Sequence, residues 1–171
     1  MLIIIILLGL ILRLINLNQS FWLDEAAQLV MSQKSLSWIW FDRSADFHPP
    51  LFYFLTHFWL HISRSETILR LLPVTFGLLA IPAIYLLAAK LFGKKIAVYA
   101  ALFTTINPYL VYYSQEMRSY SLMLFLSILS MNYLVRKQYF WLFLVNTLLI
   151  YTHYSSFLFI LSYFVLRVQG A

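Results

Sequence analysis

Long uncharged, apolar segments alternate along the chain with short polar ones. Arg13 is the single charge in 1–16, and uncharged runs recur at 71–89, 96–115, 119–135 and 138–166. An apolar helix needs about 20 residues to cross the roughly 30 Å hydrocarbon core of a bilayer. The last run is long for one span, which indicates a tight hairpin around residues 152–154. The pattern therefore predicts helical spans at about 1–16, 68–90, 95–114, 118–135, 138–152 and 154–168.

The region 17–67 is more polar and predicts a large first loop. It contains Trp22, Trp38 and Trp40, and tryptophans concentrate at membrane–water interfaces. Within it, 24–33 is typical of a short helix. The apolar stretch 49–62 would reach only about 21 Å as a helix, which is too short to span. We therefore expect helices that lie along the membrane surface.

The distribution of charge predicts the orientation of the chain. If 49–62 does not span and the N-terminus is inside, the basic connectors fall inside, and they comprise Lys90, Lys94, Lys95, Arg136, Lys137 and Arg167. All the acids then fall outside, namely Asp24, Glu25, Asp42, Asp46, Glu66 and Glu116. If 49–62 did span, most of these basic residues would move outside. The positive-inside rule favours the first topology.

Composition excludes a soluble protein. Of 171 residues, 63% are hydrophobic and 11% charged, with a mean hydropathy of +0.82, which leaves too little polar surface to cover a soluble globule. We expect one all-α transmembrane domain over 1–171, a polytopic bundle of about six spans in the cell membrane. The net charge of +6 indicates basic cytoplasmic loops and contact with membrane lipids rather than nucleic acid. The sequence begins without a basic segment or cleavage site, so the first span is expected to stay uncleaved.

An acidic pair, Asp24 and Glu25, lies in the first outer loop beside Trp22. Such a pair can bind a divalent cation or act as a general base toward an attacking hydroxyl or amine. It can equally be an ordinary acidic first turn, which the helix dipole favours. The sequence leaves both interpretations open. With no cysteine in the chain, a thiolate nucleophile or thiolate metal site is excluded.

A second polar group, Glu116 and Arg118, follows the segment 107–113. Ionisable residues this close to hydrocarbon are costly and usually functional. At this spacing the two do not share a helix face, so each is expected to serve a different partner. Glu116 suits a cation and is a candidate metal ligand, whereas Arg118 suits a phosphate oxygen. The alternative is an interfacial arginine that reaches toward lipid headgroups.

Four histidines complete the candidates. His48 precedes two prolines and is a candidate metal ligand or phosphate contact, and His153 lies in the predicted hairpin and is a candidate phosphate contact. Each can instead be a structural residue. His57 and His61 are spaced to bind zinc from one helix face, but no third ligand is apparent in the sequence. The predicted topology brings Asp24, Glu25, His48, Glu116, Arg118 and His153 to the same outer face.

Several ordered segments resemble a known family. They are Phe21–Ala26, His48–Tyr53, Arg70–Pro73 with Phe76–Gly93, Asn107–Pro108 with Tyr113–Ser121, and Tyr151–Tyr154. In this order they resemble the GT-C glycosyltransferases, and most closely the bacterial relatives of protein O-mannosyltransferases and aminoarabinose lipid A transferases. Members of that family are several hundred residues long, so the chain is expected to match their N-terminal part.

The resemblance implies sugar transfer from a polyprenyl-phosphate-linked donor to an acceptor on the periplasmic or outer face. It implies that Asp24, with Glu25 beside it, supplies the catalytic base, and that Glu116 matches a second acid of the active-site cavity. A divalent metal ion is one candidate cofactor. The alternative function is a non-catalytic membrane protein, such as a transporter of lipid carriers or an assembly subunit. A transporter should place charges near the bilayer midplane, whereas here they cluster at the ends of the predicted spans.

Overall fold

The computed structural model describes residues 1–41 and 48–169, which form ten α-helices and no strand. The helices are α1 (Leu2–Leu14), α2 (Leu23–Ser32), α3 (Leu36–Phe41), α4 (Leu51–Trp59), α5 (Glu66–Phe92), α6 (Lys94–Ile106), α7 (Pro108–Gln115), α8 (Tyr120–Val135), α9 (Tyr139–Ile150) and α10 (Ser156–Gln169). The all-α prediction is thus confirmed for the described part of the chain. Asp42 and Asp46, which are predicted to lie on the outer side of the membrane, are not among the residues that the structure describes.

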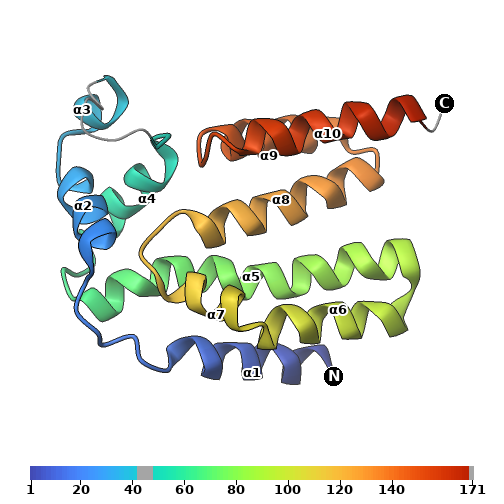
Figure 1. Cartoon of the computed structure of the whole chain (residues 1–171), viewed down its shortest axis with the longest axis horizontal. Coiled ribbons are helices and arrows are strands. Elements are labelled where there is room, and N and C mark those ends of the chain that lie inside the picture. The colour runs from blue at the N-terminus through green and yellow to red at the C-terminus, as the bar shows by residue number, and fades with distance from the viewer. Residues whose placement is uncertain (42–47, 170–171) are drawn as a thin grey trace.

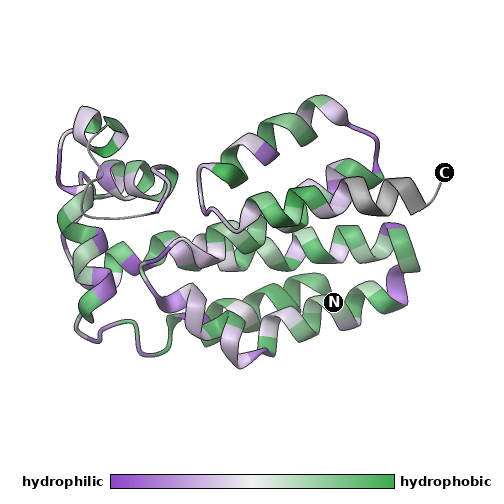
Figure 2. Cartoon of the chain, turned by 45° about the horizontal axis from the view of Figure 1, so that its top comes forward, coloured by the Kyte–Doolittle hydropathy of each residue, from purple (hydrophilic) through white to green (hydrophobic). Residues whose placement is uncertain are grey.

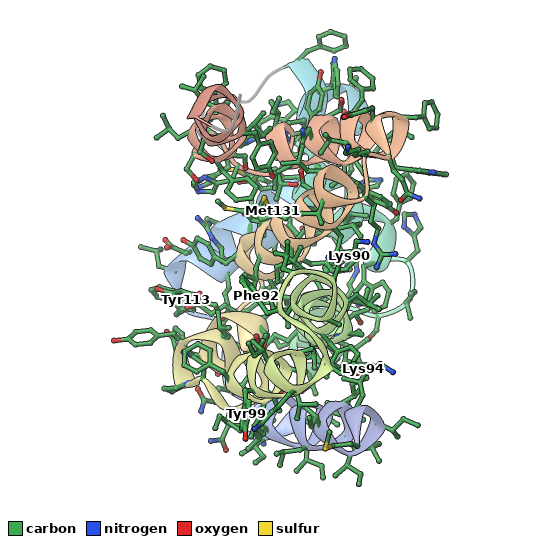
Figure 3. All side chains as sticks on the ribbon, turned by 90° about the vertical axis from the view of Figure 1, so that its right-hand side faces the viewer. Lys90, Phe92, Lys94, Tyr99, Tyr113 and Met131 are labelled. Atoms are coloured by element: carbon green, nitrogen blue, oxygen red, sulfur yellow. The ribbon has the colours of Figure 1, made fainter. Side chains whose placement is uncertain are left out.

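The helices form an elongated bundle with two different ends (Figure 1). Helices α1, α5, α6, α8, α9 and α10 run along its length, while α2, α3 and α4 gather at one end. The connection between α5 and α6 and that between α8 and α9 lie at the opposite end, together with the N-terminus. Figure 3 looks onto this opposite end, where Lys90 and Lys94 flank the turn that follows Phe92. The acidic loop and the basic connectors therefore occupy opposite ends of the bundle.

The lengths of the helices support part of the predicted topology. Among the described residues, α5 alone is long and apolar enough to cross a membrane by length and composition, and its 27 residues extend about 40 Å. Helices α1, α8 and α9 are apolar but shorter. The stretch 49–62 contains only the nine-residue helix α4, packed against α2 and α5. The predicted count of about six spans stays a prediction.

The outside of the bundle is apolar and parts of its interior are polar. Ile3, Phe103 and Phe143 are exposed, whereas Thr105, Ser130 and Asn132 are buried. Figure 2 shows hydrophobic ribbon along the helices, with hydrophilic residues concentrated toward the loops. Apolar exteriors with small polar residues between helices are typical of bundles surrounded by lipid. The surface thus supports a membrane setting for the chain.

The largest apolar core ties the α4 end to the later helices. It consists of Phe52, Leu72, Leu122, Leu126, Val145 and Leu149, drawn from α4, α5, α8 and α9. In a lipid setting such side chains stabilise the contact between helices by close van der Waals packing. The core therefore fixes α4 and the start of α8 relative to α5, and this is the end that carries the candidate functional residues.

A buried arginine stabilises the break between α6 and α7. Pro108 has no N–H, so the carbonyl of Thr104 loses its helical donor. The N–H of Tyr109 donates instead to Asn107 Oδ1 at 3.0 Å, which leaves the carbonyl of Thr105 free as well. Arg13, buried at the end of α1, donates to both carbonyls at 3.1 and 3.3 Å. Arg13 therefore joins α1 to the point where α7 changes direction.

Close contact between α5 and α7 requires Gly77. A Cβ at this position would lie 2.6 Å from the Cβ of Ser114 and 3.1 Å from Arg13 Nε. Distances below 3.0 Å force the neighbouring helix to move, and here the neighbour is the body of α7 rather than a flexible chain end. The glycine therefore sets the position of α7, whose C-terminal end leads directly to Glu116.

Candidate functional site

A buried ion pair organises the end of the bundle that carries α2. Arg70, in the first turns of α5, donates through Nε to Glu25 Oε1 at 2.9 Å and through Nη2 to Oε2 at 2.5 Å. The two side chains are 6% and 1% exposed. Such a two-point contact matches the planar guanidinium to the carboxylate, and it fixes α2 against α5.

Arg70 also holds the loop between α1 and α2. Its guanidinium donates to the carbonyls of Leu17, Gln19 and Ser20 and lies 4.9 Å from the ring centre of Phe21. The sequence contained Arg70 only as part of the family resemblance and gave it no role. A charged residue at the start of a long apolar helix was the available signal, since such residues are rarely unpaired.

Glu25 has little free capacity for chemistry. Besides Arg70, it accepts the backbone N–H of Met117 at 2.8 Å and, weakly, that of Trp22 at 3.5 Å. The Trp22 contact lies within the first turn of α2, where a glutamate at this position caps the helix start. The contact with Met117 joins the first loop to the segment after α7. Glu25 is therefore a connector of α2, α5 and the 116–119 segment.

Arg118 connects Asp24 with His48. Its Nη1 donates to the backbone oxygen of Asp24 at 3.3 Å and its Nη2 lies 3.4 Å from His48 Nε2. The guanidinium is 6.0 Å from the ring centre of Tyr120. Arg118 thus brings together residues that are 94 and 70 positions away. It has five N–H donors, and these contacts leave some of them for a ligand.

His153 joins this cluster from the turn between α9 and α10. Its ring centre is 5.6 Å from that of His48 and 6.5 Å from that of Tyr120. Burial lowers the pKa of His153, and the neighbouring His48 and Arg118 lower it further. These surroundings therefore favour the neutral imidazole. Its Nδ1 accepts the backbone N–H of Ser155 at 3.2 Å, so the ring hydrogen lies on Nε2.

Glu116 is buried with an unsatisfied oxygen. It is 5% exposed, and its Oε2 has no hydrogen-bond partner among the described residues. Burial raises the pKa of Glu116, as do the charges of Glu25 and Asp24, while Tyr112 and Arg118 act in the opposite direction. A carboxyl group with a raised pKa can hold or exchange a proton nearer neutral pH.

A polar cavity of about 480 Å³ opens beside Glu116. Its walls come from the first loop, α5 and α7, and consist of Asn16, Gln19, Ser20, Trp22, Glu25, Arg70, Tyr112, Gln115 and Glu116. Gln115 donates to the carbonyls of Leu12, Arg13 and Ile15 at the end of α1. The cavity therefore lies where the start of the first loop meets the 116–119 segment.

The structure brings most of the predicted candidates into one region but not around one cavity. Glu25 and Glu116 line the cavity, whereas Arg118, His48 and His153 form an adjoining cluster against Asp24. Among the described residues, Asp24 and His48 do not line the cavity. Within the described chain, no group of three or more His, Cys, Asp or Glu side chains could hold a metal ion. Glu116 as a metal ligand stays a prediction.

The bundle is apolar on its outside, and its α2 end holds a buried arginine–carboxylate pair next to an arginine–histidine cluster. These features suit a membrane protein that binds a polar ligand at one end of the bundle. Comparison with protein families identifies the group. The model of the dolichyl-phosphate-mannose-protein mannosyltransferase family matches residues 47–168, which is more than half of the chain. The chain belongs to this family, as the ordered motifs indicated. No curated protein and no solved structure gives a significant match.

Proposed function

We propose that this chain takes part in sugar transfer from a polyprenyl-phosphate-linked donor to an acceptor at the outer face of the cell membrane. The observation that carries the proposal is the contact of Arg118 with both Asp24 and His48. Through the backbone oxygen of Asp24, this contact holds the Arg118 guanidinium at the start of α2, at the end of the bundle that also carries the Asp24 side chain. A lipid-linked phosphate at the membrane surface can reach this end. Membership of the family supports the same chemistry.

Asp24 is the better of the two acids for a catalytic base. Glu25 is occupied by Arg70 and Met117, and removing a buried charge from its partner is costly. Among the described residues no hydrogen bond or ion pair engages the carboxylate of Asp24, which is partly exposed. In our proposal Asp24 removes the proton as the acceptor attacks, and Glu25 positions α2.

The reaction needs a base and stabilisation of a leaving phosphate. The acceptor oxygen or nitrogen forms a bond to the anomeric carbon, and Asp24 takes its proton. The bond from that carbon to the phosphate oxygen breaks, and the polyprenyl phosphate leaves with the electron pair. The donors of Arg118 stabilise this charge. Neutral His153, with its hydrogen on Nε2, and His48 supply further contacts to the phosphate.

The cavity beside Glu116 is proposed to hold the sugar. Asn16, Gln19 and Ser20 offer the polar groups that a hexose hydroxyl needs, and Trp22, which is 49% exposed, offers an apolar ring face. Glu116, with its raised pKa, can donate a hydrogen bond to a sugar hydroxyl as a neutral acid. A divalent ion on Glu116 is not required by this arrangement.

The test is transfer of radiolabelled mannose from polyprenyl-phosphate mannose in membranes that contain the protein. Base catalysis contributes about 10²–10⁴-fold, so Asp24→Asn should reduce transfer by that order while membrane insertion stays normal. Glu66→Gln is the matched control, because Glu66 lies in the first turn of α5 and is not among the cavity residues. Transfer at the wild-type rate by Asp24→Asn would show that Asp24 is not the base.

A further inference from the structure

A second cavity lies between the ends of α2 and α4, away from the candidate functional site. It has a volume of about 350 Å³ and is lined by Ser32, Gln33, His57, Leu60, His61 and Arg64. The rings of His57 and His61 both line it, with their centres 5.6 Å apart. The proposed sugar-transfer function uses none of these residues.

The hydrogen bonds of both histidines determine which nitrogen carries the hydrogen. His57 Nδ1 lies 2.8 Å from the carbonyl oxygen of Ser32, and His61 Nδ1 lies 3.1 Å from the carbonyl oxygen of His57. A carbonyl only accepts, so each Nδ1 must donate. In each neutral ring the free lone pair is therefore on Nε2.

This arrangement is the usual one for metal-binding histidines. A ligating imidazole commonly donates its other N–H to a backbone carbonyl, which sets the tautomer and makes the ligating nitrogen more basic. An ion that lies about 2.0–2.1 Å from each Nε2 lies roughly 3 Å from each ring centre, so two rings that share it can have centres up to about 6 Å apart. The ring centres of His57 and His61 are 5.6 Å apart, which satisfies this limit. His57 lies in the last turn of α4 and His61 in the turn that follows it, and the two residues line the same cavity.

We propose that His57 and His61 bind one divalent transition-metal ion, of which Zn²⁺ is the representative, through their Nε2 atoms. Imidazole nitrogen favours zinc, copper and nickel over magnesium or calcium, which prefer oxygen ligands. Since no third His, Cys, Asp or Glu side chain joins the pair in the described chain, water fills the remaining positions. The bound ion ties the end of α4 to the end of α2 through the contact with Ser32.

The other close histidine pair provides an internal contrast. His48 and His153 are also 5.6 Å apart, but their ring nitrogens face donors. Arg118 donates toward His48 Nε2, and the N–H of Ser155 donates to His153 Nδ1. Ring separation alone therefore does not define the site; what distinguishes His57 and His61 is that the Nδ1 of each ring donates to a carbonyl and leaves an Nε2 lone pair.

Arg64 distinguishes a cation site from an anion site in this cavity. Its positive charge lines the same cavity and opposes a cation, although the side chain is exposed and screened by salt. Arg64→Gln should therefore leave zinc affinity unchanged or increase it. If the cavity were instead an anion site, with both rings protonated, the same change would weaken binding.

The experiment is calorimetric titration of the detergent-purified protein with ZnCl₂, using an affinity tag free of histidine; the absence of cysteine removes thiolate competitors. We expect one ion per chain, at least a tenfold loss of affinity in His57→Gln and His61→Gln, and no loss in His48→Gln. His61 is exposed, so His61→Gln keeps the fold. Wild-type affinity in His61→Gln, or equal losses in His48→Gln, would overturn the proposal. Phosphate binding that Arg64→Gln abolishes would also overturn it.

Discussion

Asp24 and Glu25 are neighbours in the chain but have different surroundings. Glu25 is 1% exposed and accepts two hydrogen bonds from Arg70 and one from the backbone of Met117. Asp24 is partly exposed, and its backbone oxygen contacts Arg118. Successive helix positions are separated by 100°, because a turn contains 3.6 residues. The two acids therefore face different neighbours, which is why we assign them different roles.

The buried ion pair makes a prediction about stability. Removing one partner of a buried pair leaves an uncompensated charge and costs about 3–5 kcal/mol. Glu25→Gln and Arg70→Met should each lower the free energy of unfolding in mixed micelles by that order. Because both remove the same interaction, the double variant should lose clearly less than the sum. Purely additive losses would contradict the pairing, and Glu66→Gln serves as the control for a charge change elsewhere.

Glu116 makes a prediction about pH. Its pKa is raised from the ordinary value of 4.5, first by burial. A group whose pKa is raised by folding favours the folded state at low pH, and that contribution is lost as pH rises from 4.5 through the folded-state value. Relative to Glu116→Gln, the wild-type protein should therefore lose thermal stability as pH rises through this window. Melting temperatures of both proteins measured from pH 4 to 8 test this, and a difference independent of pH would contradict it.

At the scale of elements, the break between α6 and α7 determines where the candidate site begins. Pro108 and Asn107 end one helix and start the next, since Asn107 Oδ1 accepts from the N–H groups of Tyr109 and Leu110. Arg13 satisfies the carbonyls that this break leaves free. The short helix α7 then packs on Gly77 and delivers the 116–119 segment to Glu25.

This arrangement predicts that Arg13 and Pro108 are energetically coupled. Arg13→Met should destabilise the protein by several kcal/mol, because each buried carbonyl without a donor costs about 1–3 kcal/mol. In a Pro108→Ala background the new backbone N–H can reach the carbonyl of Thr104, so Arg13→Met should cost at least about 1 kcal/mol less there. Unfolding of the four proteins measures the coupling. An equal cost in both backgrounds would show that Arg13 does not serve the break.

At the scale of the whole molecule, charge separates along the bundle. The acids that gather near α2 and the basic residues near the α5–α6 turn lie at opposite ends (Figures 1 and 3). Such a separation predicts a preferred orientation of the bundle in a membrane, because basic loops are retained in the cytoplasm. It also argues for a surface-facing site over a transport pathway, which needs charges near the midplane.

The orientation can be tested by labelling single cysteines in the otherwise cysteine-free chain. In intact cells an impermeant thiol reagent should label Ser65→Cys, which is exposed before α5, and not Lys94→Cys, which follows it. Both should be labelled after the membrane is permeabilised, which controls for reactivity. Labelling of Lys94→Cys in intact cells would show that the orientation is the reverse of the predicted one, with the candidate site on the inner side of the membrane.

Hydropathy alone was enough to predict several of the long helices of the bundle. The predicted segments 68–90, 118–135 and 138–152 correspond to α5, α8 and α9, because an apolar helix satisfies its own backbone and needs no distant partner. The turn at 152–154 was predicted because the uncharged run 138–166 is too long for one span, and the predicted short helix at 24–33 corresponds to α2 (Leu23–Ser32). The division of 95–114 into α6 and α7 was signalled by Pro108 but was not predicted as two helices.

The roles of the residues at the site depend on long-range contacts that local sequence pattern does not show. That Asp24, His48, Glu116, Arg118 and His153 share one end followed from counting spans and charges. The choice between Asp24 and Glu25 did not, because it rests on Arg70, 45 residues away, and on a backbone N–H 92 residues away. Local pattern determines which segments are helical and which end of the bundle each loop occupies. Only tertiary packing decides which carboxylate is neutralised and which faces a ligand, since burial and long-range hydrogen bonds are properties of the folded chain.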